Sequence, residues 1–464
     1  MGFLKSFFRE VKYYPSAIVG VLVIVALLIL SLYAVIKIPY SEAIELWRGT
    51  GETWYHNPKT APPAWINYFR SRKLPTTIVL DSRKGGPDIE RSEKPLGQGK
   101  QIDLTFTFDY QADDFPSDLV MYFYVTGNGK QPFATGEWTT PDGRTVRLGN
   151  FAISHRYSFR FTQEKDLSRR LKRMLKRELP VEVGLFVDPA ALPKDREAQV
   201  DIKTLPPLKG KYTVHVTVTT FDPETDVQAE LIVYGKVYGL AGTDHLRRDL
   251  MVGLLWGTPV AIAFGLISSL VIGLATMIIA AVGVWYGGVV DETIQRITEI
   301  NLVLPFLPIL LMVGIFISRS LLTIMLVTIA LSIFGSGIKS YRAMFLQLRE
   351  SPYIEAARAY GAGDGRIIFL YLIPRILPML IPGFVSAIPS FVFLEASLAV
   401  LGIGDPVLPT WGKIIQDAQA NAALYKGLYY WILEPSVLLI VTGLGFSLLG
   451  FALDRIFNPR LRQE

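Results

Sequence analysis

The stretch "EAARAYGAGDGRIIFLYLIP" occupies residues 355–374 and separates two long apolar segments. Ser351 and Pro352 precede it and favour a helix start, because a serine hydroxyl accepts from free N–H groups and proline suits the first helical position. Its alanines favour a slim helix, and Gly361 can adopt the left-handed conformation that ends one. We expect Asp364 to cap a second helix, which Pro374 ends or kinks before the next apolar segment. The stretch thus predicts a compact helix–turn–helix.

The composition around this stretch is typical of a membrane protein with a polar insert. The chain has 464 residues, half of them are hydrophobic, and the charged residues concentrate between positions 40 and 250. The net charge of +6 does not by itself indicate a nucleic-acid partner, since much of the positive charge falls where membrane topology places it. Because there is no cysteine, disulfides and thiolate chemistry are excluded.

A helix needs about 20 apolar residues to cross a bilayer. The first apolar segment, residues 16–38, is longer than the core of a signal peptide, so we expect an uncleaved anchor. Pro259 is expected to divide the next apolar block into an amphipathic lead-in, residues 246–258, and a membrane span. The six predicted spans are residues 16–38, 260–285, 300–317, 321–338, 376–401 and 432–453.

Small residues recur at every fourth position between residues 253 and 273. Such a row allows a second helix to approach closely, although glycine and alanine are also common in membrane helices in general. We favour a packed helix bundle because the row is long. Its members are Gly253, Gly257, Ala261, Gly265, Ser269 and Gly273.

The distribution of lysine and arginine predicts the orientation of the spans, since cytoplasmic loops carry more of them. The short loops expected outside contain only Arg319, Lys413 and Lys426, whereas the remaining short loops are richer in basic residues. Both termini and the 355–374 stretch are then cytoplasmic, and residues 40–245 are extracytoplasmic. The predicted parts are a terminus and first span, 1–39, an insert, 40–242, and a five-span core, 243–464, with a cytoplasmic loop, 339–375.

Alternating hydrophobicity predicts that the insert is a β-rich, sandwich-like domain. The expected strands are residues 101–110, 118–127, 211–222 and 229–239, with a turn at 139–145. Residues 164–179 differ, because they form a basic amphipathic pattern with Leu167, Leu171, Met174 and Leu175 on one face. Such a helix either contacts anionic headgroups or an acidic partner, or packs by its apolar face on its own sheet, which we favour.

No sequence pattern supports an enzyme. The phosphate-binding motif G-x-x-x-x-G-K-[ST], the zinc motif H-E-x-x-H and the nucleophile motif G-x-S-x-G do not occur. The four histidines, His56, His155, His215 and His245, lack ligand spacing, and we expect His215 to be a structural residue of a strand. We therefore predict no catalytic residue, no metal site and no cofactor.

Four residues of the predicted spans and their edges are candidates for a pore or gate: Glu395, Pro305, Pro389 and Trp411. Ionisable groups within a membrane usually face a bundle interior or a water path, so Glu395 either lines a solute route or bonds a neighbouring helix. Prolines such as Pro305 and Pro389 interrupt helices and serve either as hinges or as static packing features.

The 355–374 stretch resembles the "EAA" loop of ATP-binding cassette (ABC) importer permeases. The match rests on Glu355, Ala356, Ala357, Gly361 and Pro374, with Tyr371-Leu372-Ile373 in place of the usual Ile-x-Leu. Three more segments resemble the dipeptide/oligopeptide/nickel branch of that family: "GTDHLRRDLMVGLLWGTPVAI" (242–262), "YGGVVDETIQRITEI" (286–300) and "LEASLAVLGIGDPVLPTWGKII" (394–415). Arg247 stands where this branch usually has glycine. The chain is similar to the C-type of the two paired permeases, whereas the insert has no counterpart in the resemblance.

The resemblance implies an all-α, six-helix permease bundle in the cell membrane, carrying the insert between spans one and two. Its implied partners are a second permease, two cytoplasmic ATP-binding subunits and an extracellular solute-binding protein. The residues implied to couple to the ATP-binding subunits are Glu355, Ala356, Ala357, Arg358, Gly361, Asp364 and Pro374. Oligopeptides or dipeptides are the expected cargo, with oligosaccharides as the alternative and nickel less expected. A membrane-anchored receptor or scaffold is the alternative from another class.

Overall fold

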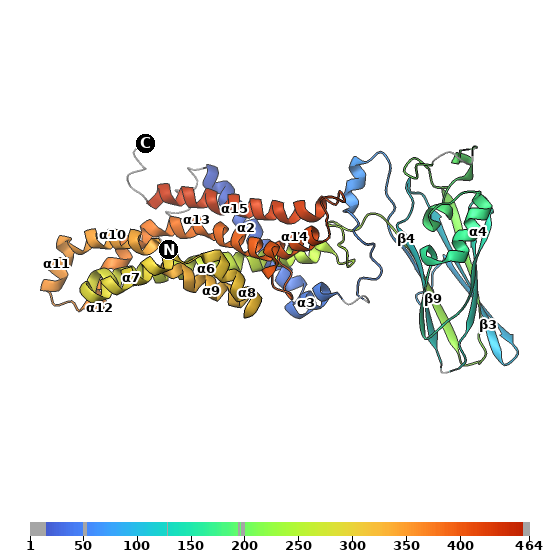
Figure 1. The fold of residues 1–464 in the computed structure, drawn as a ribbon, viewed down its shortest axis with the longest axis horizontal. Helices are drawn as coiled ribbons and strands as arrows, with labels where there is room; N and C mark the ends of the chain where they lie inside the picture. Colours follow the sequence, from blue (N-terminus) through green and yellow to red (C-terminus); the bar gives the residue numbers. More distant parts are fainter. Residues whose placement is uncertain (1–14, 50–52, 128, 194, 196–199, 458–464) are drawn as a thin grey trace. The chain divides into compact units, whose positions relative to one another are not determined.

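The computed structural model describes residues 15–49, 53–127, 129–193, 195 and 200–457. Contacts divide this part of the chain into two compact units. One unit contains the residues up to Arg48 together with those from Leu250 onward, and the other is Gly49–Asp249. Figure 1 shows that the first is built from helices and that the second contains the strands. We call them the helical unit and the β unit.

The helical unit contains long apolar helices joined by short ones. The first described helix of this unit is α2 (Pro15–Lys37), which ends at the basic residue Lys37. The others described are α3 (Tyr40–Arg48), α6 (Leu250–Tyr286), α7 (Gly288–Val303), α8 (Phe306–Phe316), α9 (Leu321–Ile333), α10 (Gly337–Arg349), α11 (Pro352–Ala359), α12 (Asp364–Arg366), the π-helix η4 (Ile367–Leu372), α13 (Ile373–Leu398), the π-helix η5 (Ala399–Ile403), α14 (Trp411–Ala420) and α15 (Tyr430–Phe457).

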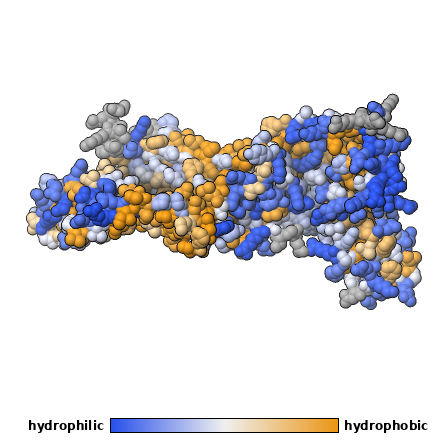
Figure 2. All heavy atoms as spheres, viewed as in Figure 1, coloured by the Kyte–Doolittle hydropathy of each residue, from blue (hydrophilic) through white to orange (hydrophobic). Residues whose placement is uncertain are grey.

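Four helical stretches within the described residues are long and apolar enough to cross a membrane, or up to six if each of two bent helix pairs is one span. The four are Pro15–Lys37, Leu250–Tyr286, Asp364–Ile403 and Tyr430–Phe457. The bent pairs are α7 with α8, at 77°, and α9 with α10, at 45°. Hydrophobic side chains cover much of the middle of the helical unit, whereas the end formed by α10, α11 and α12 is more hydrophilic (Figure 2).

Two span predictions were wrong in detail. Residues 300–317 do not form one straight helix, because the chain leaves the helical conformation at Leu304 and Pro305 and bends sharply there. Pro259 does not divide its apolar block, since it lies inside α6, an unbroken helix of 37 residues. A proline removes one backbone hydrogen bond, and the apolar packing on both sides of Pro259 keeps the helix in one piece.

The row of small residues on α6 forms a packing face, as predicted. A Cβ atom added to Gly265 would lie 2.7 Å from the Val392 side chain, and one added to Gly273 would lie 2.4 Å from the Phe384 ring. The hydroxyl of Ser269 donates to the carbonyl of Phe384 at 2.5 Å. These contacts bring α13 against α6 along several turns, and α13 packs also on α15.

The β unit consists of two antiparallel sheets, which confirms the predicted β-rich insert. One sheet has the order β1-β9-β4-β7 and the other β2-β3-β8-β5-β6. The strands are β1 (Ile78–Asp81), β2 (Ile89–Leu96), β3 (Gly99–Tyr110), β4 (Asp118–Thr126), β5 (Phe133–Thr139), β6 (Thr145–Ala152), β7 (Arg156–Arg160), β8 (Gly210–Thr219) and β9 (Asp226–Tyr234).

Alternate residues of both sheets point into one shared core. Leu104 of β3 pairs with Val216 of β8, Met121 of β4 pairs with Leu231 of β9, and all four are buried. All four predicted strands are present, whereas β1, β2, β5, β6 and β7 were not predicted. These strands carry more glycine and charged residues, as in β2 (IERSEKPL) and β5 (FATGEWT), so their alternation is weak.

The basic amphipathic segment forms α4 (Lys165–Leu175) and packs on its own domain, as favoured. Leu167 and Leu171 are buried in the shared core, and Leu175 packs against it. Met174 differs from the prediction, because its side chain is 37% exposed. The remaining short helices of this unit are η1 (Ala64–Phe69), η2 (Phe161–Gln163), α5 (Val181–Gly184) and η3 (Pro189–Ala191).

Candidate functional site

The predicted helix–turn–helix begins at α11, which Ser351 precedes and Pro352 opens. The proline position is as predicted, but the expected serine cap is wrong. The Ser351 hydroxyl donates to the Leu348 carbonyl and accepts no bond from α11. It thereby satisfies the end of the preceding helix, α10, rather than the start of α11, because the two helices are only two residues apart.

Gly361 ends α11 as predicted. Its φ angle is +78°, in the left-handed region that favours glycine. The Ala362 N–H donates to the Ala357 carbonyl at 3.0 Å, and the Gly361 N–H donates to the Arg358 carbonyl at 2.9 Å. This pair of bonds is the Schellman motif, which satisfies carbonyls that a helix end would otherwise leave free.

Two expectations for the second helix were wrong. Gly363 is its N-cap, and Asp364 is its first residue, with no side-chain cap bond. Pro374 does not end this helix, since the helical path runs from Asp364 to Ile403. The wider π-turns of η4 lie directly before Pro374, and the Ile373 N–H donates to the carbonyl of Ile368, five residues earlier. This widening accommodates a residue that lacks an N–H.

Buried contacts anchor α11 to the long helices. Ile354 is 1% exposed and shares a core with Val284 of α6 and Leu372 of η4. Arg358 also contacts α6, because its guanidinium carbon lies 4.3 Å from the centre of the Trp285 ring. Such cation–π contacts add attraction to the packing. A displacement of α11 must therefore act on both α6 and the start of the α13 path.

The opposite face of α11 is exposed. Glu355, Ala356 and Ala359 are exposed, and Tyr360 at the turn is 93% exposed. Alanine side chains keep this face narrow, while Glu355 lies in the first turn, where a negative charge complements the helix dipole. A narrow ridge with one aromatic side chain at its tip is suited to a groove on another protein.

Two of the pore or gate candidates lie together at a buried junction. Glu395 of α13 is 4% exposed and lies within hydrogen-bonding reach of the Thr410 side chain. Trp411, the next residue, begins α14 and donates from Nε1 to the Leu254 carbonyl of α6 at 3.0 Å. The Trp411 ring fills the space above Gly257, where an added Cβ would lie 2.3 Å from it. The junction joins α6, α13 and α14.

Of the two proline candidates, Pro305 lies outside the helices that meet at this junction, whereas Pro389 belongs to α13, as Glu395 does. Pro305 is the N-cap of α8, at the 77° bend after α7. Pro389 is buried inside α13, where the helix continues without a break. The structure therefore supports a bend at Pro305 and a packed, unbroken helix at Pro389.

Asp405, which no sequence motif indicated as a site residue, lies in the loop between η5 and α14. Its Oδ2 accepts from the N–H of Leu321, the first residue of α9, at 2.9 Å. Its Oδ1 accepts from the N–H groups of Val407 and Leu408, at 2.8 and 3.2 Å. The Asp-Pro pair at 405–406 indicated a turn, but only the structure shows that this carboxylate caps a helix distant in sequence.

Asp405 also lines a cavity of about 690 Å³. Ser318, Arg319 and Ser320 supply further polar groups, from the turn between α8 and α9. Most of the wall is apolar and comes from α6, α9 and the loop after η5; Tyr40 contributes from α3. The cavity is a mixed site, with charged and hydroxyl groups at one side of a hydrophobic wall.

An ion pair that was also missed joins α7 and α10. Arg342 contacts both carboxylate oxygens of Asp291, at 2.6 to 3.0 Å. Arg349, further along α10, donates from Nη1 to the Val284 carbonyl at 2.9 Å. These contacts fix α10, which carries α11, onto α6 and α7. Their partners are more than 50 residues away in the sequence, so spacing alone gave no signal.

Apolar membrane-length helices and a packed small-residue face define a multi-pass membrane protein. Residues 254–463 match the family model described as "Binding-protein-dependent transport system inner membrane component". This range includes α11, Glu395 and Trp411, and it excludes the β unit.

Known proteins of this type are similar to the chain. The oligopeptide transport system permease protein OppC of Bacillus subtilis is 28% identical over 225 residues, which cover 48% of this chain and 72% of OppC. The glutathione transport system permease protein GsiD of Pectobacterium atrosepticum is 29% identical over 229 residues, covering 48% and 72%. A putative peptide transport system permease protein of Brucella abortus is 31% identical over 230 residues, covering 48% and 75%.

The chain belongs to the family of binding-protein-dependent transport system inner membrane components, the permease subunits of ABC transporters. The resemblance drawn from the sequence motifs is thereby confirmed.

Proposed function

We propose that the chain is the permease subunit of an ATP-driven importer for peptides. It forms half of a translocation pore with a second permease, and two cytoplasmic ATP-binding subunits dock on it. A solute-binding protein delivers the cargo. The peptide class rests on the names of the relatives, which are oligopeptide, dipeptide and glutathione permeases.

The proposed topology has six spans, which are the four long helical stretches and one span within each of the two bent helix pairs. Both termini and the loop 339–375 face the cytoplasm, because this loop and the C-terminal region are rich in arginine. Residues 1–39 comprise the N-terminus and the first span, residues 40–242 the extracytoplasmic insert, and residues 243–464 the transport core. The insert helps to dock the binding protein or stabilises the assembly.

The observation that carries the proposal is the two-sided character of α11. One face is anchored through Ile354 and Arg358 to α6 and η4, and the other is narrow and exposed. The coupling residues are Glu355, Ala356, Ala357, Arg358, Gly361, Asp364 and Pro374. A soluble subunit binds the exposed face of α11. It can move the transmembrane helices because the buried face of α11 transmits the displacement to them.

The proposed mechanism follows from these contacts. Closure of the ATP-binding subunits on ATP displaces α11, and the shared core passes the displacement to α6 and α13. At the other end of these helices the same two elements meet at the Glu395–Trp411 junction. We propose that this junction holds the gate side of the pore and moves with them, while Pro305 provides a bend for the α7–α8 pair.

The proposal is tested by extracting the tagged chain from its native membrane in mild detergent and identifying what remains bound. A second permease and P-loop ATPase subunits are expected. Ala356→Arg adds a bulky charge to the exposed face of α11 and should release the ATPase subunits while keeping the second permease. Gln347→Arg, on the exposed face of α10, is the matched control.

A chain that is recovered alone, or only with copies of itself, would reject the proposed assembly and favour the receptor or scaffold. Retention of the ATPase subunits and of uptake by Ala356→Arg would reject α11 as the docking element. The cargo is tested separately, by competition for labelled tripeptide uptake. Inhibition by oligosaccharides rather than by peptides would replace the cargo and leave the coupling proposal intact.

A further inference from the structure

The β unit exposes a cluster of large apolar side chains around η1. The exposed fractions are 43% for Trp65, 89% for Tyr68, 81% for Phe69 and 69% for Leu240. The Trp65 and Phe69 rings meet edge to face, with centroids 6.3 Å apart. The indole Nε1 of Trp65 donates to the Leu240 carbonyl at 2.8 Å. We call these four residues the aromatic patch.

Hydrogen bonds hold the backbone that carries the aromatic patch. The Asn67 side chain closes the loop after η1, with Nδ2 donating to the Leu74 carbonyl and Oδ1 accepting from the Leu74 N–H, both at 3.0 Å. The Ala64 N–H donates to the Gly239 carbonyl at 2.9 Å. The rings are thus presented in a fixed arrangement, and an exposed apolar cluster of this kind marks a contact surface.

The chain tethers this surface to the bilayer. Leu240 precedes the first residue of α6 by ten residues, and α6 is one of the membrane-length helices. Ten residues reach at most about 35 Å even when fully extended. Hydrogen bonds also join the segment that precedes η1 to the segment that precedes α6. The Thr60 N–H donates to the Asp244 carbonyl, and the Thr243 N–H donates to the Ala61 carbonyl. The patch therefore lies on the part of the β unit from which the chain returns to the membrane.

The chemistry of the patch matches a lipid headgroup region. Tryptophan and tyrosine concentrate there, because their rings are apolar and their N–H or O–H groups remain hydrated. The residues directly after η1 include the exposed cations Arg70 and Lys73, which suit anionic headgroups. A surface that combines exposed rings with adjacent cations fits a membrane better than a polar protein surface.

We infer that the aromatic patch inserts into the headgroup region of the bilayer and holds the insert against the membrane surface. This role is separate from transport and from the coupling helix. The four side chains of the patch fix one face of the domain to the lipid.

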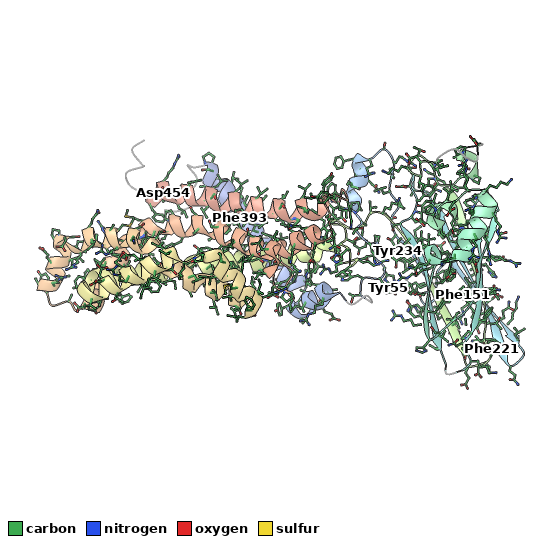
Figure 3. The ribbon with its side chains drawn as sticks, viewed as in Figure 1. Tyr55, Phe151, Phe221, Tyr234, Phe393 and Asp454 are labelled. Carbon is green, nitrogen blue, oxygen red and sulfur yellow. The ribbon has the colours of Figure 1, made fainter. Side chains whose placement is uncertain are left out.

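The absence of cysteine allows a direct test by site-directed spin labelling of the full chain. Tyr68→Cys and Phe69→Cys carry the label in the patch. Phe221→Cys is the matched control, because Phe221 is also aromatic and 50% exposed. It lies in the turn that leads into β9, whereas Leu240 follows Tyr234, the last residue of that strand (Figure 3).

The chain is reconstituted in vesicles of phosphatidylcholine and phosphatidylglycerol, and collision rates are measured with oxygen and with a water-soluble nickel complex. Oxygen concentrates in lipid and the nickel complex in water. Labels at 68 and 69 should collide several-fold more with oxygen and several-fold less with nickel than the label at 221. Equal nickel collision at all three positions would overturn the inference.

A second experiment separates lipid contact from protein contact. A label at Leu240→Cys should lose its lipid signature when Tyr68 and Phe69 are both replaced by serine, and both side chains are exposed enough to be changed without disturbing the core. In native membranes with all partner subunits present, labels shielded from both reagents would show that a protein covers the patch and would overturn the lipid contact.

Discussion

The guanidinium of Arg358 lies 4.3 Å from the centre of the Trp285 indole ring. Arg358 belongs to α11, the short helix whose other face is exposed, and Trp285 lies one residue before the end of α6. α6 is 37 residues long and carries the glycine row that packs on α13. The contact joins the proposed docking helix directly to one of the membrane-length helices.

Arg358→Gln should weaken coupling, because it removes a cation–π contact worth about 0.5–2 kcal/mol. We expect peptide uptake by the reconstituted importer to fall several-fold, with the ATPase subunits still bound. Arg366→Gln is the control, because it removes the same charge from an exposed position in α12. None of the described contacts places the Arg366 side chain on an aromatic ring. Equal losses in the two variants would show that charge alone matters.

Gly361→Ala should destabilise the turn after α11. A residue with a Cβ at φ +78° is strained by about 1–2 kcal/mol, although no neighbouring atom blocks the side chain. We expect faster hydrogen exchange at residues 359–362 and reduced uptake.

Gly363→Ala is the matched control for the turn, since its φ is −69° and its added Cβ also meets open space. It should retain normal exchange and uptake. If Gly363→Ala lowered uptake as much as Gly361→Ala, the left-handed backbone would not be the reason for either effect.

Gly257→Ala should disrupt the junction at Trp411. The added Cβ would lie 2.3 Å from the Trp411 ring, so the ring must move and weaken its bond to Leu254. Overpacking of this kind costs about 1–3 kcal/mol, and the melting temperature of the purified protein in detergent should fall. Gly383→Ala in α13, where a Cβ meets nothing within 4 Å, should leave it unchanged or higher. A normal melting temperature for Gly257→Ala would contradict this packing.

Asp405→Ala should loosen the start of α9, because Asp405 caps the Leu321 N–H. Loss of a cap costs about 0.5–2 kcal/mol, so amides at residues 321–324 should exchange faster. Asp405→Asn keeps an acceptor oxygen and should be affected less. Equally fast exchange in Asp405→Asn and Asp405→Ala would indicate that charge, rather than the acceptor, holds the helix.

Local signals predicted the parts of the candidate site that depend on a few neighbouring residues. The turn at Gly361 was predicted because left-handed backbone strongly favours glycine. The packing face of α6 was predicted because small residues at a helical repeat permit close approach. In both cases the physical constraint acts within one or two helical turns.

The errors concern residues whose role depends on distant neighbours. Ser351 was expected to cap α11, but its hydroxyl turns to α10 because a carbonyl is available there. Pro374 was expected to end or kink a helix, but the helical path continues because η4 widens to accommodate the proline. Asp405 was not singled out, since its partner Leu321 lies 84 residues earlier. Backbone groups can be satisfied in several ways, and packing selects one.

The sequence by itself determined the apolar segments, the β-rich insert and the extent of α11, because hydropathy, strand alternation and glycine conformation act locally. Its motifs also resembled those of the permease family. Only the tertiary structure decided that α6 passes through Pro259, that α7 and α8 meet at a sharp bend, and that Arg358 rests on Trp285. These features depend on which surfaces of distant segments meet, and the close packing of those surfaces outweighs local preference.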